Sequence, residues 1–267
     1  MSIMSRARPI SAPKESQGSQ KRPPLIFGQK THENFHFYDY FVAPAQPLIV
    51  TEGHTDPVYL RNAIRRLAAG HGQLGTVTPK GFTYKVKFFN YENVVTILLR
   101  MGGSDPLKNL ATDYERRLKR YDHKPMQHPV ILLLDNDSGL STFSNAVLGK
   151  FKKVINLTTK DDFYHLTHNL YVVKTPEPPS GSQSCIETLL GDDFAKLLDG
   201  KVFPASKEDF DPSKHIKKTD FARKVVAKKA AEIDWSGYDP LLARIEAVIS
   251  HYTPPASPFP QPTISSN

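Results

Sequence analysis

The chain has little cysteine and no long apolar run. Cys185 is the only cysteine in 267 residues, which excludes an internal disulfide and a zinc site built from several cysteines. No stretch approaches the roughly 18 consecutive apolar residues of a membrane-spanning helix. The first thirty residues also contain no apolar segment of the kind that a signal peptide requires. We therefore expect a cytoplasmic protein without a membrane partner.

Two common ligand-binding patterns are also missing. No Gly-x-x-x-x-Gly-Lys-Ser/Thr segment is present, so the chain has no ATP-binding loop of that type. The Asp-x-Asp sequence at 135–137 begins like an EF-hand, but an EF-hand loop needs glycine at its sixth position and glutamate at its twelfth. Here Gly139 is fifth and Ala146 is twelfth, which excludes that motif. His165 and His168 have no third imidazole or cysteine at a matching spacing, so we expect surface or turn histidines.

The composition is that of a folded domain with a basic surface. A hydrophobic content of 39% supports a core, and many of the 22 prolines lie near the chain ends. We expect a linker or disordered segment at 1–34, a domain at 35–200, a C-terminal helical extension at 201–252 and a disordered tail at 253–267. The net charge of +8 favours a polyanionic partner such as nucleic acid, with an ordinary basic surface as the alternative.

Two apolar runs end in acidic residues followed by glycine. The run at 48–51 leads into Glu52 and a glycine, and the run at 130–134 leads into Asp135 and Asp137 and then a glycine. Short apolar runs with these boundaries are typical of buried parallel strands. Ligands of such sheets bind beyond the carboxyl ends of the strands, where the strand order reverses. If the two strands are neighbours there, the three carboxylates converge.

Three neighbouring carboxylates repel one another unless a cation offsets their charge. Oxygen ligands without clustered cysteine or histidine favour Mg²⁺ or Mn²⁺. Phosphoester chemistry is therefore the leading class of function.

The ordered pair of motifs resembles a known family. Thr51-Glu52-Gly53-x-Thr55-Asp56 and Leu134-Asp135-Asn136-Asp137-Ser138-Gly139 are similar to the motifs of the Toprim domain. That domain is shared by type IA and type II topoisomerases, bacterial primases, small ribosomal-RNA maturases and overcoming-lysogenization-defect nucleases. The resemblance covers roughly residues 36 to 250 and looks closest to the Toprim region at the C-terminus of certain retron reverse transcriptases. It implies an α/β, Rossmann-like, mostly parallel sheet of four to five strands with helices on both faces.

Periodicity and boundary residues predict the individual elements. Beyond the two acidic strands, we expect strands at 84–90, 153–157 and 170–173, and helices after Pro57 and at 92–101, 105–124, 141–151 and 241–249. Residues 70–81 are expected to form a loop. Asp56 is expected to cap the helix after Glu52, with a role near the metal as the alternative. The aromatic segment 35–41 either covers the domain's own core or forms an interface with a missing partner.

The resemblance adds further candidate residues. The segment 185–190 resembles an Ile-Glu-Asp-Leu segment of related nucleases, which makes Glu187 a candidate metal ligand beside Glu52, Asp135 and Asp137. Lys218 occupies the place of a lysine that is expected to reach the scissile phosphate. The surrounding helix has a strongly positive face, expected either to follow a phosphate backbone or simply to be solvated. The candidates for nucleic-acid binding are Lys214, Lys217, Lys224 and Lys228.

These observations predict a metal-dependent nuclease that hydrolyses phosphodiester bonds of DNA or RNA, with Glu52, Asp135, Asp137 and Lys218 as catalytic residues. The retron resemblance implies an antiphage effector whose partners are a reverse transcriptase and its RNA-linked DNA. Two alternatives use the same site. One is a topoisomerase-like or primase-like module, although the length and single cysteine do not accommodate the additional domains of those enzymes. The other is a non-catalytic regulator with a structural metal.

Overall fold

A five-stranded sheet forms the centre of the part of the chain that the structure describes. The structure, a computed structural model, describes residues 27–89, 106–177, 183–204, 206 and 208–256. The strand order is β4 (Lys87–Phe88), β1 (Leu48–Thr51), β5 (Val130–Leu134), β7 (Leu170–Lys174) and β6 (Tyr164–Thr167). The first four strands are parallel, and β6 is antiparallel to β7. The expected α/β fold with a mostly parallel sheet of four to five strands is confirmed.

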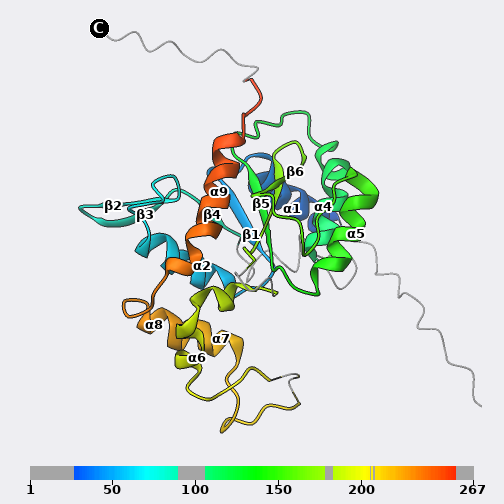
Figure 1. The fold of residues 1–267 in the computed structure, drawn as a ribbon. Coiled ribbons are helices and arrows are strands. Elements are labelled where there is room, and N and C mark those ends of the chain that lie inside the picture. The colour runs from blue at the N-terminus through cyan, green and yellow to red at the C-terminus, as the bar shows by residue number, and fades with distance from the viewer. Residues whose placement is uncertain (1–26, 90–105, 178–182, 205, 207, 257–267) are drawn as a thin grey trace, which may run out of the picture.

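Helices cover both faces of this sheet, as Figure 1 shows. Alternate strand residues point to opposite faces, so Leu48 and Val50 of β1 join one core cluster while Ile49 joins the other. The first cluster includes residues of α1 (Phe27–Phe37), α4 (Pro106–Leu118) and α5 (Leu140–Phe151). The second includes residues of α2 (Asp56–Arg66) and α9 (Asp239–His251). Covered faces explain why β1, β5 and β7 are apolar without alternation.

The C-terminal part is helical, as expected, and contributes to the second cluster. It contains η2 (Ile186–Leu190), α6 (Asp192–Leu198), α7 (Lys218–Asp220), η3 (Phe221–Val226), α8 (Ala227–Lys229) and η4 (Ser236–Tyr238). Helical residues run without interruption from Lys218 to Lys229. Phe221, Ala222 and Val226 are fully buried in the second cluster and the lysines of this segment are exposed, which confirms its amphipathic character.

The expected strand at 153–157 is wrong. Asn156 Oδ1 accepts hydrogen bonds from the backbone N–H groups of Thr158 and Thr159, at 2.9 and 3.0 Å. This side chain therefore stabilises a turn in place of a strand. The sheet ends instead with β6, a segment that the sequence interpretation passed over, and Ile155 still contributes to the core.

The expected strand at 84–90 is correct only at its centre. The sheet strand β4 is short, and Tyr84 belongs instead to β3 (Gly81–Tyr84), which pairs with β2 (Gly75–Thr78) in an antiparallel hairpin. The expected loop at 70–81 therefore contains a strand. Gly81 has a φ of 123°, a backbone angle that residues with a side chain rarely adopt, so glycine suits the turn of this hairpin. Figure 1 shows the hairpin projecting away from the sheet.

The N-terminal segment is structured from Phe27, earlier than expected. Glu33 on α1 forms a 2.6 Å ion pair with the buried Arg117 of α4, so residues 27–34 are not a linker. Phe37 and Phe41 are 1% and 0% exposed and pack in the first core cluster. These two rings cover the domain's own core, which is the first of the two alternatives expected for this segment.

The remaining expected helices correspond to α2, α4, α5 and α9, although α4 ends at Leu118 instead of near residue 124. The helix expected at 92–101 lies outside the described residues, as do residues 1–26 and 257–267. Over the described ranges, no helix combines the length and apolar character needed to cross a membrane.

Candidate active site

The acidic residues follow two neighbouring strands. β1 and β5 are parallel partners with Thr51 opposite Leu133, so Glu52 and Asp135 leave the same edge of the sheet. β4 lies on one side of β1, whereas β5 and β7 lie on the other. The strand order thus reverses between β1 and β5, which is where open α/β sheets bind their ligands.

The loop after β1 folds back onto Asp56. The backbone N–H of Gly53 donates a 2.8 Å hydrogen bond to Oδ2 of Asp56. A Cβ on Gly53 would lie 2.5 Å from the other carboxylate oxygen, so only glycine allows this close approach without rearrangement. Thr55 occupies the N-cap position and Asp56 is the first residue of α2. Asp56 therefore stabilises the loop through its carboxylate but is not the N-cap itself.

The loop after β5 has a similar construction. The N–H of Gly139 donates a 2.7 Å hydrogen bond to Oδ1 of Asp137. A Cβ on Gly139 would lie 3.0 Å from this oxygen and 3.9 Å from Oε1 of Glu52. Glu52 and Asp137 therefore approach one another although they come from different strands. Each motif glycine makes room for a carboxylate.

Glu187 reaches the same place from η2. The N–H of Ile186, its neighbour, donates a 3.1 Å hydrogen bond to Oδ1 of Asp135. Glu187 is only 2% exposed, and its Oε1 lies 3.0 Å from Nζ of Lys218. Its Oε2 is buried without a hydrogen-bond partner, as is the hydroxyl of Tyr59. Burying a carboxylate oxygen without a hydrogen-bond partner costs free energy unless a ligand binds to it.

Burial and mutual repulsion perturb the acids. The pKa of Asp135 is raised to about 8, first by burial and then by the charges of Asp56, Glu187, Glu52 and Asp137, in that order. Burial also raises the pKa of Asp56 to about 7, against the effect of the hydrogen bond from Gly53. For Lys218, partial burial lowers the pKa, but the Glu187 carboxylate outweighs it and the net shift is upward. Asp135 and Asp56 therefore hold their protons more tightly than free aspartates do, and a bound cation would favour their ionised forms.

The carboxylates suit a hydrated cation better than a closed metal cage. Within the described part of the chain, no three His, Cys, Asp or Glu side chains lie close enough together to hold a metal ion as they stand. Mg²⁺ usually keeps several waters and takes only one or two protein carboxylates, together with phosphate oxygens of a substrate. The donor set and the unpartnered Oε2 of Glu187 fit such an ion, whereas soft-metal chemistry has no ligands here.

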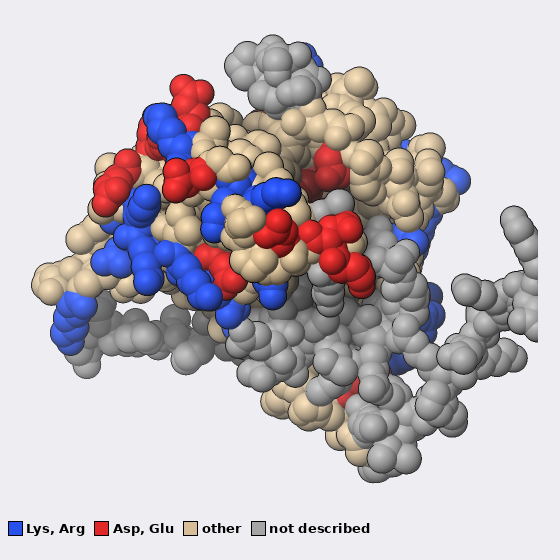
Figure 2. Space-filling model, turned by 90° about the horizontal axis from the view of Figure 1, so that it is seen from below, with Lys and Arg blue, Asp and Glu red and all other residues tan. Residues whose placement is uncertain are grey.

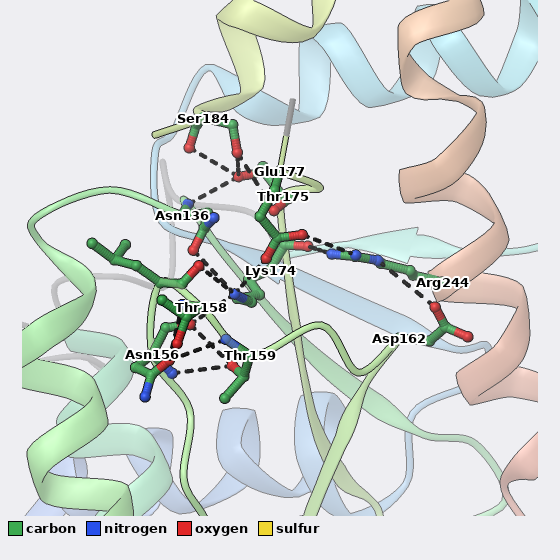
Figure 3. Close-up of polar contacts among 11 residues, drawn as sticks. Asn136, Asn156, Thr158, Thr159, Asp162, Lys174, Thr175, Glu177, Ser184 and Arg244 are labelled. Atoms are coloured by element: carbon green, nitrogen blue, oxygen red, sulfur yellow. Dashed lines mark hydrogen bonds and ion pairs between the residues drawn. The ribbon is translucent and has the colours of Figure 1, made fainter. Parts of the chain in front are cut away.

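A buried lysine supports the Asp135–Asp137 loop, as Figure 3 shows. Lys174, at the end of β7, is 0% exposed and donates hydrogen bonds to Oδ1 of Asn136 at 3.1 Å, to the carbonyl of Asn156 at 2.7 Å and to Glu177 at 2.7 Å. Backbone hydrogen bonds of 2.9 and 3.0 Å also join Asn136 to Ser184. Asn136 is therefore fixed by its side chain and its backbone, which orients the two aspartates that flank it.

Only a weak signal in the sequence indicates a special role for this lysine. Lys174 ends an otherwise apolar strand of five residues, and an ammonium group that cannot reach water needs carboxylate and carbonyl partners. The carboxylate of Glu177 is only three residues away, but the oxygens of Asn136 and Asn156 are 38 and 18 residues away, so the sequence interpretation missed the network.

The expected nucleic-acid-binding lysines lie on the surface beside the carboxylates. Lys214, Lys217, Lys224 and Lys228 are all exposed. Lys224 pairs with Asp220 at 2.8 Å, and Nζ of Lys217 lies 4.9 Å from the centre of the Phe210 ring. Figure 2 shows basic side chains gathered over the C-terminal helices, beside a group of acidic side chains on the same face. The basic surface reaches the acidic site at Lys218, which contacts Glu187 and directly follows Lys217.

The two histidines of the β6–β7 hairpin behave as expected of turn residues. Both are exposed, and Nε2 of His165 lies 2.8 Å from the carbonyl of His168.

No protein-family model matches the chain, and no solved structure matches it. The resemblance to Toprim nucleases therefore stays a prediction that rests on the two motifs.

Proposed function

We propose that this protein is a divalent-metal-dependent nuclease of the Toprim type. The observation that carries the proposal is the convergence of Glu52, Asp135 and Asp137 at the point where the strand order reverses, with Glu187 and Lys218 beside them. Carboxylates in this position, next to an exposed row of lysines, suit a substrate that is both a phosphoester and a polyanion. On the retron resemblance, we further propose an antiphage role with a reverse transcriptase and its RNA-linked DNA as partners.

The residues of the site have distinct roles in this proposal. Glu52, Asp135 and Asp137 bind the metal, one or two of them directly and the others through its water molecules, and Glu187 is an additional candidate ligand whose Oε2 has no other partner. Bound Mg²⁺ or Mn²⁺ would polarise the phosphate and lower the pKa of a water molecule. Lys218 neutralises Glu187 in the absence of substrate and offsets charge on the phosphate as it develops. The raised pKa of Asp135 implies that this acid gives up a proton when the cation binds.

A non-catalytic regulator is the second candidate. The described carboxylates are not close enough for three of them to hold one ion, and Lys218 already satisfies one oxygen of Glu187. If such a site bound a metal ion but cleaved no phosphodiester bond, the metal would have a structural or regulatory role. The topoisomerase-like or primase-like reading has no separate observation in its favour.

The experiment that tests the proposal combines cleavage with metal binding. The purified chain is incubated with end-labelled single-stranded DNA, duplex DNA and RNA in Mg²⁺, in Mn²⁺ and in EDTA, and Mg²⁺ binding is measured by calorimetry. We expect cleavage of at least one substrate with either metal and none in EDTA. Asp135→Asn should abolish cleavage, whereas Asp122→Asn, at an exposed position before β5, should retain it.

Two outcomes would oppose the proposal in different ways. Full activity of Asp135→Asn would contradict the assignment of Asp135 to the active site. Tight Mg²⁺ binding that depends on Asp135, without cleavage of any substrate, would favour the non-catalytic regulator.

A further inference from the structure

A cavity beside β4 has the chemistry of a nucleotide site. It has a volume of about 730 Å³, within the range of small-ligand sites. Its lining combines basic and aromatic side chains with no described aspartate or glutamate. The side chains that carry the argument are Arg61, Lys87, Arg223, Tyr40, Tyr84 and His54. Cations next to aromatic rings, without carboxylates, suit an anion attached to a flat ring system.

Two of the cations that line the cavity lie against aromatic rings. The guanidinium of Arg61 lies 5.1 Å from the centre of the Phe88 ring, and Nζ of Lys87 lies 4.6 Å from that of Tyr40. The only ion pair described for Lys87 is with Asp39 at 3.8 Å, and both side chains are partly exposed. An ion pair of this kind contributes little, so Lys87 can exchange it for a phosphate.

The cavity adjoins the carboxylate site. His54 and Pro57, which line it, belong to the same loop and helix start as Glu52 and Asp56. Nε2 of His54 also lies 3.3 Å from Oγ1 of Thr219, the residue after Lys218. The cavity and the carboxylates are thus two neighbouring parts of one edge of the sheet, on the β4 side and the β5 side of β1.

We infer that this cavity binds one unpaired nucleotide of the substrate strand, next to the phosphate that the carboxylate site would hold. Arg61, Arg223 and Lys87 contact the phosphate, and the rings of Tyr40 and Tyr84 contact the base. A base inside a cavity cannot be paired in a duplex, so the inference makes the protein selective for single strands. It rests on the proposed function for its substrate class, and it adds strand selectivity and a second set of residues.

Binding is tested in EDTA, where no metal-dependent cleavage occurs. The probe is a dye-labelled 12-nucleotide DNA or RNA strand measured by fluorescence anisotropy, with the corresponding duplex as the second arm. We expect Tyr40→Leu to weaken single-strand binding roughly 5-fold to 150-fold, because the stacking of one base on an aromatic ring changes affinity by that range. Tyr40→Phe should retain binding, and duplex binding should not change in either variant.

Controls separate a binding role from a structural one. Tyr38→Leu is the control for lost packing, because Tyr38 is also partly buried against the first core cluster but does not line the cavity. Arg61→Gln should lower the slope of log affinity against log salt by about 0.7 for a single strand, whereas Arg66→Gln, exposed on the same helix, should leave it unchanged.

The possible results are distinguishable. Unchanged single-strand binding by both Tyr40→Leu and Arg61→Gln would overturn the inference, as would an equal loss of duplex binding. Adenosine monophosphate serves as a competitor, and binding as tight as that of the 12-mer would assign the cavity to free nucleotides. Suppose that these variants lose strand binding while Asp135→Asn still cleaves the substrate. This result would contradict the proposed active site but support the nucleotide-binding cavity.

Discussion

Asp135→Asn should make the metal-free protein more stable, and increasingly so as the pH rises. Asp135 is largely buried, and its pKa in the folded state is about 8. In the unfolded chain an aspartate has a pKa of about 3.9. The folded protein therefore binds more protons than the unfolded chain between these values, so this group lowers the free energy of unfolding as the pH rises from about 4 to about 8. Asparagine removes the ionisation, and its amide oxygen can still accept the hydrogen bond from Ile186.

The magnitude follows from the two pKa values. One pH unit corresponds to about 1.4 kcal/mol for one proton. At pH 7 the folded Asp135 retains its proton, whereas the same residue in the unfolded chain loses its proton about three pH units lower. This difference corresponds to a destabilisation of roughly 4 kcal/mol. At pH 5 the same calculation gives a destabilisation of about 1.5 kcal/mol. The advantage of the variant should thus grow by about 1.4 kcal/mol per pH unit over this interval.

The assay is urea unfolding followed by circular dichroism at pH 5, 6, 7 and 8, in EDTA. Asp122→Asn, at an exposed position, serves as the control and should follow the wild type. Added Mg²⁺ should stabilise the wild type much more than Asp135→Asn, because binding to the folded state alone raises the free energy of unfolding. Parallel pH profiles for the wild type and Asp135→Asn would refute the reasoning, since they would mean that Asp135 ionises normally in the folded protein.

Three further substitutions test the proposed roles. Lys218→Met should lower kcat about 100-fold with little change in KM, as expected for a charge that acts on the transition state, whereas a raised KM with normal kcat would assign Lys218 to substrate binding. Lys174→Met should reduce the free energy of unfolding by about 3 kcal/mol, because it leaves Glu177 with one cationic partner fewer, and an unchanged melting temperature would contradict the network in Figure 3. His71→Phe should cost about 2 kcal/mol in thermal unfolding, because the two ring nitrogens of buried His71 lie 2.9 and 3.0 Å from carboxylates of α9, and a variant as stable as the wild type would show that these contacts contribute nothing.

The sequence alone determined the parts of the fold that depend on local pattern. Uninterrupted apolar runs identified β1 and β5, and amphipathic spacing identified α2, α4 and α9. The acidic residues could be assigned to the carboxyl ends of those strands because they directly follow them. Predictions of secondary structure that rested on only a few residues were wrong. The Asn156 turn was interpreted as a strand, and the β2–β3 hairpin as a loop, because the outcome there depended on single side-chain contacts and a glycine with positive φ.

Only the tertiary structure decided which residues meet. Nothing within the segment 35–41 distinguishes a ring that covers its own core from one that binds a partner, and burial alone assigned Phe37 and Phe41 to the core. Lys174 contacts Asn136 and Asn156 across long stretches of sequence, and the cavity beside β4 joins side chains from η1 (Tyr38–Val42), α2, η3, β3 and β4. The charge of Asp135 likewise depends on acids from three separate segments. Local sequence fixes periodicity and strand ends, whereas burial, charge coupling and cavities arise from residues brought together by packing.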